Sequence, residues 1–302
     1  MTIMTTSTNL SIATVERETR LSKDVLRVWE RRYGFPRPER DAHGERCYPA
    51  EQVERLRLMK RLMDQGHRPG ALAALAPAEL AALAAPDRRA PADEPPAGGI
   101  AQFLELIRAR EPALLQHALR QALARQGLEH FVEQTLAPLT TAVGAYWEAG
   151  SFDVFDEHFY TESAQQLLRQ AIAGLPGARL EPRILLTTVP GEGHGLGLLM
   201  AQAVLSLEGA ACISLGTETP LLEIARAASA YGAGVVALSF AGSYPRRQVT
   251  PVLSQLRQAL PVEVELWAGG AGVARLDAVA GVRLLPTLDS GRQALAALRL
   301  KG

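Results

Sequence analysis

The sequence has few of the features that mark secreted, disulfide-linked or membrane proteins. Only two cysteines, Cys47 and Cys212, occur in 302 residues, and they lie far apart in no metal-ligand spacing. A disulfide framework is therefore excluded, and a reducing cytoplasmic location is expected. The longest apolar stretch, residues 71–85, is interrupted by Pro77 and Glu79 and is too short to cross a bilayer. The first twenty residues contain no continuous apolar core, so neither a signal peptide nor a membrane partner is expected.

The chain also lacks net charge, because 32 basic residues balance 32 acidic ones. The distribution is uneven: residues 1–75 carry 14 Lys/Arg against 10 Asp/Glu, and the remainder carries 18 against 22. Any nucleic-acid contact is therefore expected at the N-terminus. A hydrophobic content of 47% and a length of 302 residues predict two or three compact units with buried cores.

Composition divides the chain into three segments. Residues 85–99 contain four prolines and two glycines without a periodic apolar pattern, which indicates a linker. Before it lies an Arg-rich helical segment. After it, residues 100–175 repeat apolar side chains every three or four positions, with breaks near Pro112, Gly127 and Gly150. About four helices fit there, enough for a bundle.

From Glu181 onwards, short apolar runs alternate with helical patterns, which predicts a parallel sheet covered on both faces. In such folds ligands lie beyond the carboxyl ends of the strands, at a topological switch point. We therefore expect chemistry in the loops after the first, third and fourth strands. The five predicted strands are 184–189, 211–215, 235–240, 262–267 and 282–285.

The N-terminal segment predicts two short helices, 12–20 and 22–33, followed by two extended pieces around a turn at His43-Gly44. Ser22 is a suitable N-cap, with Leu21 and Leu26 in the hydrophobic-staple positions. An apolar stripe is predicted at Val25, Trp29 and Tyr33. Basic residues on the second helix and the following hairpin suit a major groove and its phosphates, although the pattern alone fits a solvated amphipathic helix equally well. These candidate DNA-binding residues are Lys23, Arg27, Arg31, Arg37, Arg40 and Arg46.

This order of elements resembles the MerR family of regulators over roughly residues 10–75. The resemblance rests on the motif V-x-R-x-W-E-R-R-Y-G, residues 25–34, and on Y-P-x-E-x-V-x-R-L, residues 48–56. It implies a dimeric winged helix-turn-helix protein that binds double-stranded operator DNA. The long coiled-coil helix of many members is missing and the linker stands in its place, so oligomerisation, as a dimer or tetramer, is expected from the C-terminal domains.

In the helical middle segment, Trp147 is followed after nine residues by Glu157-His158. Taken alone, Trp147 would be a core residue, and the other two would be surface or capping residues. The spacing resembles the bundle of cobalamin-dependent photoreceptors of the CarH/LitR type. The resemblance implies that all three face the upper side of the cofactor, which would be adenosylcobalamin.

The first loop of the C-terminal segment is rich in glycine and contains His194. A phosphate-binding loop is the general reading, but the spacing matches neither the dinucleotide nor the Walker pattern. Glu192, two residues before His194, suits a carboxylate that orients a metal-binding imidazole.

The loop resembles the cobalamin-binding signature D-x-H-x-x-G … S-x-L … G-G, with Glu192, His194 and Gly197 in the first part. Ser239 follows Gly197 after 41 residues, and Gly269-Gly270 follows Ser239-Phe240-Ala241 after 27. The resemblance implies that His194 is the lower ligand of cobalt and that the displaced nucleotide tail runs past the serine and the glycines. Two departures occur: glutamate replaces aspartate at 192, and Ala241 takes the apolar third position.

The predicted fold is multidomain: a winged helix-turn-helix at 1–80, a linker at 81–99, a four-helix cap bundle at 100–178, and a Rossmann-like, flavodoxin-like cobalamin-binding domain at 179–302. The predicted function is a light-responsive, cobalamin-dependent repressor rather than an enzyme. Two alternatives stay open. The axial histidine would also suit heme, and a bundle with a sheet also serves as the corrinoid carrier of methyltransferases.

One position departs from the photoreceptors that the chain resembles. In them a histidine directly follows the signature tryptophan and captures cobalt after illumination, whereas here the residue after Trp147 is Glu148. A carboxylate is a harder and weaker ligand for this cobalt. Of the six histidines, His158 is then the expected substitute on the upper side, with water as the alternative.

Overall fold

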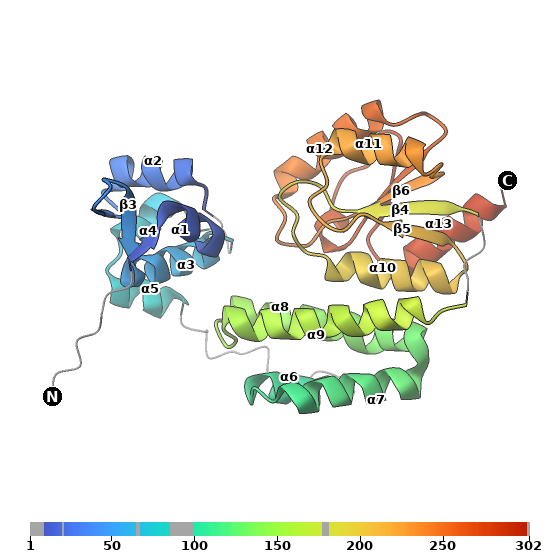
Figure 1. Cartoon of the computed structure of the whole chain (residues 1–302), viewed down its shortest axis with the longest axis horizontal. Coiled ribbons are helices and arrows are strands. Elements are labelled where there is room, and N and C mark those ends of the chain that lie inside the picture. The colour runs from blue at the N-terminus through green and yellow to red at the C-terminus, as the bar shows by residue number, and fades with distance from the viewer. Residues whose placement is uncertain (1–8, 20, 65–66, 85–98, 177–180, 301–302) are drawn as a thin grey trace. The chain divides into compact units, whose positions relative to one another are not determined.

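The computed structural model describes residues 9–19, 21–64, 67–84, 99–176 and 181–300 (Figure 1). Of the predicted linker, 81–99, residues 85–98 lie outside the described residues, and residues 81–84 are helical rather than part of a linker. The chain divides into two compact units, Met1–Asp93 with Ala145–Ser151, and Glu94–Gly144 with Phe152–Gly302. Among the described residues, no helix has both the length and the apolar character that a membrane span requires.

The N-terminal unit is a winged helix-turn-helix, as predicted. Its antiparallel sheet has the strand order β1-β3-β2, and Gly44, with φ 77°, lies in the β2–β3 turn. Strand β1 was not expected from the sequence. The elements are β1 (Asn9–Ser11), α1 (Ile12–Thr19), α2 (Lys23–Tyr33), β2 (Glu39–Arg40), β3 (Arg46–Pro49), α3 (Ala50–Asp64), α4 (Pro69–Ala74) and α5 (Pro77–Ala84).

Helix α2 begins and ends where its sequence predicts. The Ser22 hydroxyl accepts the Val25 N–H at 3.2 Å, and the helix stops at Gly34, whose φ of 65° an L-residue rarely adopts. The predicted apolar stripe packs against the core: Trp29 is buried, and Val25 and Tyr33 are half-buried against it. Leu26, which was not predicted in the stripe, is also buried. The three-residue step from 26 to 29 keeps both side chains on the core face of the helix.

The middle segment forms the predicted helices, with one irregularity. Gly127, with φ 74° and ψ 163°, interrupts the second helix, and a π-helical turn follows it. The turn buries Phe131, Val132 and Leu136 in the bundle core. The elements are α6 (Ile100–Arg108), α7 (Pro112–His130), η1 (Phe131–Leu136), α8 (Ala137–Glu148) and α9 (Val154–Ala173).

The C-terminal segment forms a five-stranded parallel sheet in the order β5-β4-β6-β7-β8. Figure 1 shows α11 and α12 on one face and α10 and α13 on the other, and a separate apolar core lies on each face. The elements are β4 (Arg183–Thr187), α10 (Leu196–Leu207), β5 (Ala211–Ser214), α11 (Leu221–Ala230), β6 (Val235–Ser239), α12 (Arg246–Ala259), β7 (Glu265–Gly269), η2 (Ala271–Val273), β8 (Val282–Leu285) and α13 (Leu288–Arg299). Strand β5 lies on one side of β4, and β6, β7 and β8 follow on the other side. The boundary between β4 and β6 is therefore the topological switch point, where ligands bind in such folds.

The fourth strand was predicted too early. It begins at Glu265, and Val262 is 95% exposed, because a turn closed by the Val264 N–H and the Pro261 carbonyl at 3.2 Å occupies those residues. The apolar pattern alone did not reveal this turn.

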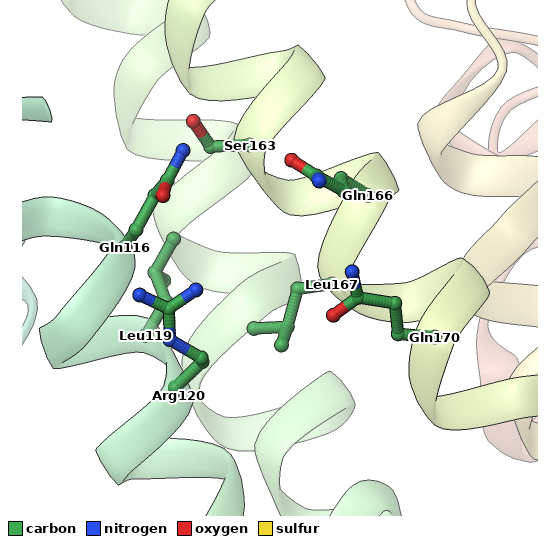
Figure 2. A pocket seen from close by; sticks show the side chains of 7 residues that line it. All are labelled: Gln116, Leu119, Arg120, Ser163, Gln166, Leu167 and Gln170. Atoms are coloured by element: carbon green, nitrogen blue, oxygen red, sulfur yellow. The ribbon is translucent and has the colours of Figure 1, made fainter. Parts of the chain in front are cut away.

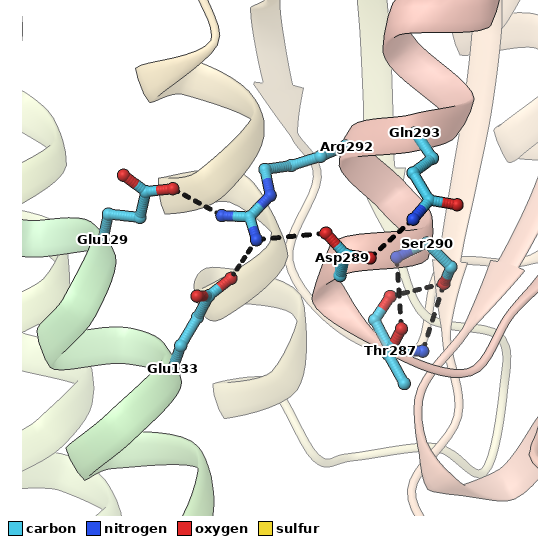
Figure 3. Close-up of polar contacts among 7 residues, drawn as sticks. All are labelled: Glu129, Glu133, Thr287, Asp289, Ser290, Arg292 and Gln293. Carbon is cyan, nitrogen blue, oxygen red and sulfur yellow. Dashed lines mark hydrogen bonds and ion pairs between the residues drawn. The ribbon is translucent and has the colours of Figure 1, made fainter.

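Bundle and sheet belong to the same compact unit. Helix α9 packs against α10, and Arg292 of α13 forms ion pairs with Glu129 of α7 and with Glu133 of η1, the latter at 2.8 Å (Figure 3). Between α7 and α9 lies a small polar recess of about 10 Å³, large enough only for a water molecule (Figure 2). The cap bundle is thus held to the sheet by apolar packing and by a cluster of charges.

Candidate cofactor site and DNA-binding surface

The loop that joins β4 to α10 presents His194 at the carboxyl end of the sheet. Glu192 Oε1 lies 2.6 Å from His194 Nδ1 and also accepts the His194 N–H at 3.0 Å. The glutamate is 1% exposed, while 42% of the histidine side chain is exposed. A carboxylate at Nδ1 places the proton on that nitrogen, which leaves the Nε2 lone pair free to bind a metal.

Glu192 also joins two loops. Its Oε2 accepts the backbone N–H of Ala241, which follows β6, at 2.8 Å. Burial by itself would raise the pKa of the Glu192 carboxyl, but the hydrogen bonds from the His194 side chain, the His194 N–H and the Ala241 N–H lower it below the ordinary value. The group is therefore a carboxylate at neutral pH, as an orienting partner for imidazole must be.

The loop after β5 also supports His194, and sequence reasoning missed it. Glu218 Oε1 accepts the Gly191 N–H at 3.2 Å, and the Glu218 N–H donates to the Thr188 hydroxyl at 2.8 Å. The Thr188 hydroxyl in turn donates to the Glu192 carbonyl. The available signal was general: β5 neighbours β4 in the sheet, so the loop beyond its carboxyl end also borders the switch point.

Small residues line the ends of β6 and β7. A Cβ at Gly197 would lie 3.1 Å from Ser239 Oγ, and one at Gly270 would lie 2.5 Å from the Phe240 carbonyl oxygen. Gly269 has the Leu285 carbonyl oxygen 3.2 Å from its Cβ position. Only glycine permits the close backbone approach at Gly269 and Gly270, at the end of β7, while Gly197 in the first turn of α10 leaves room for the Ser239 hydroxyl at the end of β6.

On the bundle side, Glu157 and His158 lie in the first turns of α9 and form a pair. Glu157 Oε2 lies 2.9 Å from His158 Nδ1, and its Oε1 accepts the Thr161 hydroxyl at 2.8 Å. Further along α9, Gln165 Nε2 would lie 3.7 Å from a Cβ on Gly195, so this helix runs beside the histidine loop. Trp147 lies in the last turn of α8, in the segment grouped with the N-terminal unit, and its place beside the pair stays a prediction.

These residues meet the requirements of a corrinoid. One imidazole presents a free Nε2 from a loop whose other nitrogen is fixed by a buried carboxylate. The adjoining strand ends carry Ser239 and the glycines rather than large side chains. The ring nitrogens of a corrin would supply most of the ligands of cobalt, so the single imidazole of His194 would suffice as the protein ligand.

In the N-terminal unit, the predicted basic surface is partly committed to internal contacts. Arg46 forms an ion pair with Glu30 at 3.0 Å and is half-buried, so it ties the wing to α2. The other pairs are more open. Lys23 lies 3.6 Å from Glu16, Arg27 lies 3.4 Å from Asp24, and Arg40 donates to the Gly44 carbonyl at 2.6 Å.

Two of the predicted arginines are the most available to a ligand. Arg31 is exposed and forms no ion pair within the part of the chain that the structure describes. Arg37 is also exposed, and its Nε donates to the Gly34 carbonyl at 2.9 Å. The terminal nitrogens of an arginine held in this way can still reach a phosphate.

Comparison with known proteins assigns both parts of the chain. Residues 10–79 match the MerR HTH family regulatory proteins, and residues 100–172 match the B12 binding domain. Two repressors of Myxococcus xanthus are similar to the chain. The HTH-type transcriptional repressor CarH is 31% identical over 85% of this chain and 87% of its own length, and CarA is 32% identical over 87% of each.

The monomethylamine corrinoid protein of Methanosarcina barkeri has a similar fold, with a TM-score of 0.53 and 16% identity over 65% of this chain and 96% of that one. At this identity the likeness concerns the fold alone, and it agrees with the predicted bundle and Rossmann-like sheet. The curated relatives are transcriptional repressors rather than enzymes, as predicted. The chain belongs to the MerR-type, B12-binding family of transcriptional repressors that includes CarH and CarA.

Proposed function

We propose that this repressor binds adenosylcobalamin and releases or rebinds double-stranded operator DNA in response to light, as a cytoplasmic homo-oligomer, a dimer or tetramer. The observation that carries the proposal is the His194 imidazole, whose Nδ1 is held by the buried Glu192 carboxylate at the switch point of the sheet. We assign the DNA-binding domain to residues 1–84, because α5 continues to Ala84, the linker to 85–99, the cap to 100–178 and the cofactor domain to 179–302.

Below the cofactor, His194 Nε2 is the metal ligand and Glu192 fixes its orientation. The Ala241 N–H, by binding the second oxygen of Glu192, keeps the carboxylate from turning away from the imidazole. Gly197, Ser239, Gly269 and Gly270 border the path of the nucleotide tail. A side chain at Gly269 or Gly270 would meet neighbouring backbone, and one at Gly197 would meet the Ser239 hydroxyl.

Above the cofactor, Trp147, Glu157 and His158 enclose the upper ligand. When bound, adenosylcobalamin supplies a cobalt–carbon bond that light breaks. Glu148, directly after Trp147, offers a carboxylate where an imidazole would bind cobalt more strongly. His158 has its Nδ1 on Glu157, which leaves Nε2 as the nitrogen that could bind a metal, so it is the imidazole that we assign to this side.

We assign contacts with the major groove of DNA to Lys23, Arg27 and Arg31 of α2. Arg37 and Arg40 of the wing contact the phosphate backbone of the DNA. Arg46 acts through its ion pair with Glu30, which holds the wing against α2. Arginine and lysine side chains on such a surface supply phosphate and base-edge contacts.

The test uses the purified full chain, mixed in the dark with adenosylcobalamin, hydroxocobalamin or heme. The expected result is retention of both cobalamins with the spectrum of a cobalamin that has lost its own base to a histidine, and no stoichiometric heme. Operator sites are then selected from a random-sequence duplex pool in the dark, and binding is compared before and after illumination. Retention of heme alone would contradict the proposal, as would an affinity for operator DNA that changes neither with the cofactor nor with illumination.

A further inference from the structure

Two residues combine an unusual backbone with a side chain that braces the proposed cofactor site. Among the residues that the structure describes, Arg110 with φ 56° and Glu218 with φ 59° are the only non-glycine residues with a left-handed backbone. This conformation is unfavourable for an L-residue, and glycine would adopt it freely. Such backbone strain is concentrated at functional sites, where the contacts of the side chain offset the free energy that the backbone conformation costs.

Arg110, in the turn between α6 and α7, grips the beginning of α9. Its Nε donates to Asp156 Oδ1 at 3.1 Å, and its Nη2 donates to Asp153 Oδ2 at 2.9 Å. The guanidinium also lies 4.5 Å from the centre of the Phe155 ring, which is otherwise 55% exposed. One side chain therefore contacts the N-cap and two residues of the first turn of α9.

The residues that Arg110 holds are those that start the helix. Asp153 is the N-cap, and Asp156 Oδ2 accepts the Asp153 N–H at 3.0 Å, which closes a capping box. Asp156 is 6% exposed, so the Arg110 guanidinium neutralises a buried carboxylate. Glu157 and His158 follow directly, and the direction in which they project depends on this first turn.

Glu218 plays the corresponding part on the sheet side of the proposed site, where it contacts the loop that carries His194. Its backbone N–H and its carboxylate bind Thr188 and Gly191, at the two sides of the turn that leads to His194. The left-handed backbone at 218 allows both bonds at once, because the side chain and the N–H then point to the same loop. Its second carboxylate oxygen lies 4.0 Å from the position of a Cβ on Gly193, just before the histidine.

We propose that Arg110 and Glu218 are a pair of positioning residues, one for each axial side of the cofactor. Arg110 fixes the Glu157–His158 pair of the cap, and Glu218 fixes the loop that carries His194. The inference rests on the proposed function, since it names residues that serve that same site. It follows that removing either side chain, with the backbone conformation retained, loosens one face of the site and leaves the other unchanged.

Glycine is the suitable substitution because it keeps the left-handed backbone and removes only the side chain. In Arg110→Gly, the affinity for adenosylcobalamin should fall about tenfold, while that for hydroxocobalamin, which has only a small upper ligand, changes less than twofold. Adding Glu157→Gln should cause little further loss, because its orientation is already lost. Equal losses for both cobalamins, or fully additive losses, would overturn the role of Arg110.

In Glu218→Gly, the affinities for both cobalamins should fall together by about tenfold, with a smaller fraction of bound cofactor carrying the histidine spectrum. Glu218→Gln should restore binding, because an amide oxygen accepts the Gly191 N–H as a carboxylate does. A glutamine variant as weak as the glycine variant would refute this role. Arg226→Ala, which removes an exposed arginine of α11, is the matched control and should bind like the parent.

Hydrogen exchange of the cofactor-free chain separates this proposal from the proposed function. The amides of Asp156 and Glu157 should exchange faster in Arg110→Gly, and that of Gly191 should exchange faster in Glu218→Gly, each with the other region unchanged. A parent chain that binds no cobalamin would end the proposed function, whatever the exchange rates. If the parent binds cobalamin but the amides of Arg110→Gly and Glu218→Gly exchange at parent rates, the positioning role alone is overturned.

Discussion

The carboxylate of Glu192 lies 2.6 Å from His194 Nδ1, and 1% of the residue is exposed. This contact fixes both the tautomer and the direction of the imidazole before any cofactor arrives. Since the same carboxylate also accepts the Ala241 N–H, the two loops at the switch point are joined through one buried group.

Replacing His194 with Ala should remove the proposed lower ligand of cobalt. We expect weaker cobalamin retention and an absorption spectrum without the protein-histidine form, because none of the neighbouring groups described above offers another imidazole. His117→Ala is the control, since His117 lies on α7 and its Nε2 pairs with Gln121 at 2.8 Å. An unchanged spectrum and affinity in His194→Ala would disprove the assignment.

Glu192→Gln should weaken cobalamin binding by about 10–100-fold while leaving the histidine in place. A glutamine amide has one oxygen that accepts and one nitrogen that only donates, whereas the two carboxylate oxygens accept from both His194 and Ala241. Titration of the cofactor into each variant measures the loss. Parent-like affinity in Glu192→Gln would mean that the carboxylate does not orient the ligand.

Arg31→Ala and Arg46→Ala should differ in their effect on DNA. Arg31 is exposed, so its loss should weaken binding to a random-sequence duplex and lower the slope of log K against log salt by about 0.9 if it meets a phosphate. Arg46 is paired with Glu30, so its loss should mainly lower the free energy of unfolding by about 1 kcal/mol. The reverse pattern would show that the ion pair opens on DNA.

Illumination should distinguish His158 from water as the upper ligand. We expect the illuminated parent to carry His158 or water above cobalt, because Glu148 replaces the histidine used by the photoreceptors that the chain resembles. Spectra of illuminated parent and His158→Ala, with DNA release followed in parallel, provide the comparison. A stable photoproduct with two histidine ligands that persists in His158→Ala would refute the proposal.

Tyr160 should make the fold sensitive to alkali. Burial raises the pKa of its phenol well above the ordinary value, even though the hydroxyl lies 2.6 Å from Thr140 Oγ1. The folded protein thus keeps this proton more tightly than the unfolded chain. The contribution of the protonated phenol to the free energy of unfolding is therefore complete below about pH 10 and is lost as the pH rises further. Above that pH, the free energy of unfolding of the parent should fall by up to about 1.4 kcal/mol per pH unit more than that of Tyr160→Phe, which has no phenol to titrate. Identical alkaline unfolding of parent and variant would contradict the assignment.

Much of the fold could be predicted because its signals are local. Ser22 was predicted as the N-cap of α2 and residue 33 as its end, and four of the five sheet strands occur where short apolar runs alternate with helical periodicity. The fourth strand was misplaced because Val262 belongs to the apolar run by composition, yet a turn exposes it. Burial of a single side chain is a property of the surrounding chain, and periodicity does not determine it.

The sequence by itself supplied the candidate residues for the cofactor site, because the spacing of Glu192, His194, Gly197 and Ser239 can be seen directly along the chain. It did not determine which groups hold them. Arg110 reaches Asp156 across 46 positions, Glu218 reaches Gly191 across 27, and the pairing of Arg46 with Glu30 spans 16. Such contacts depend on where the turns bring distant segments together, so only the tertiary structure decided them.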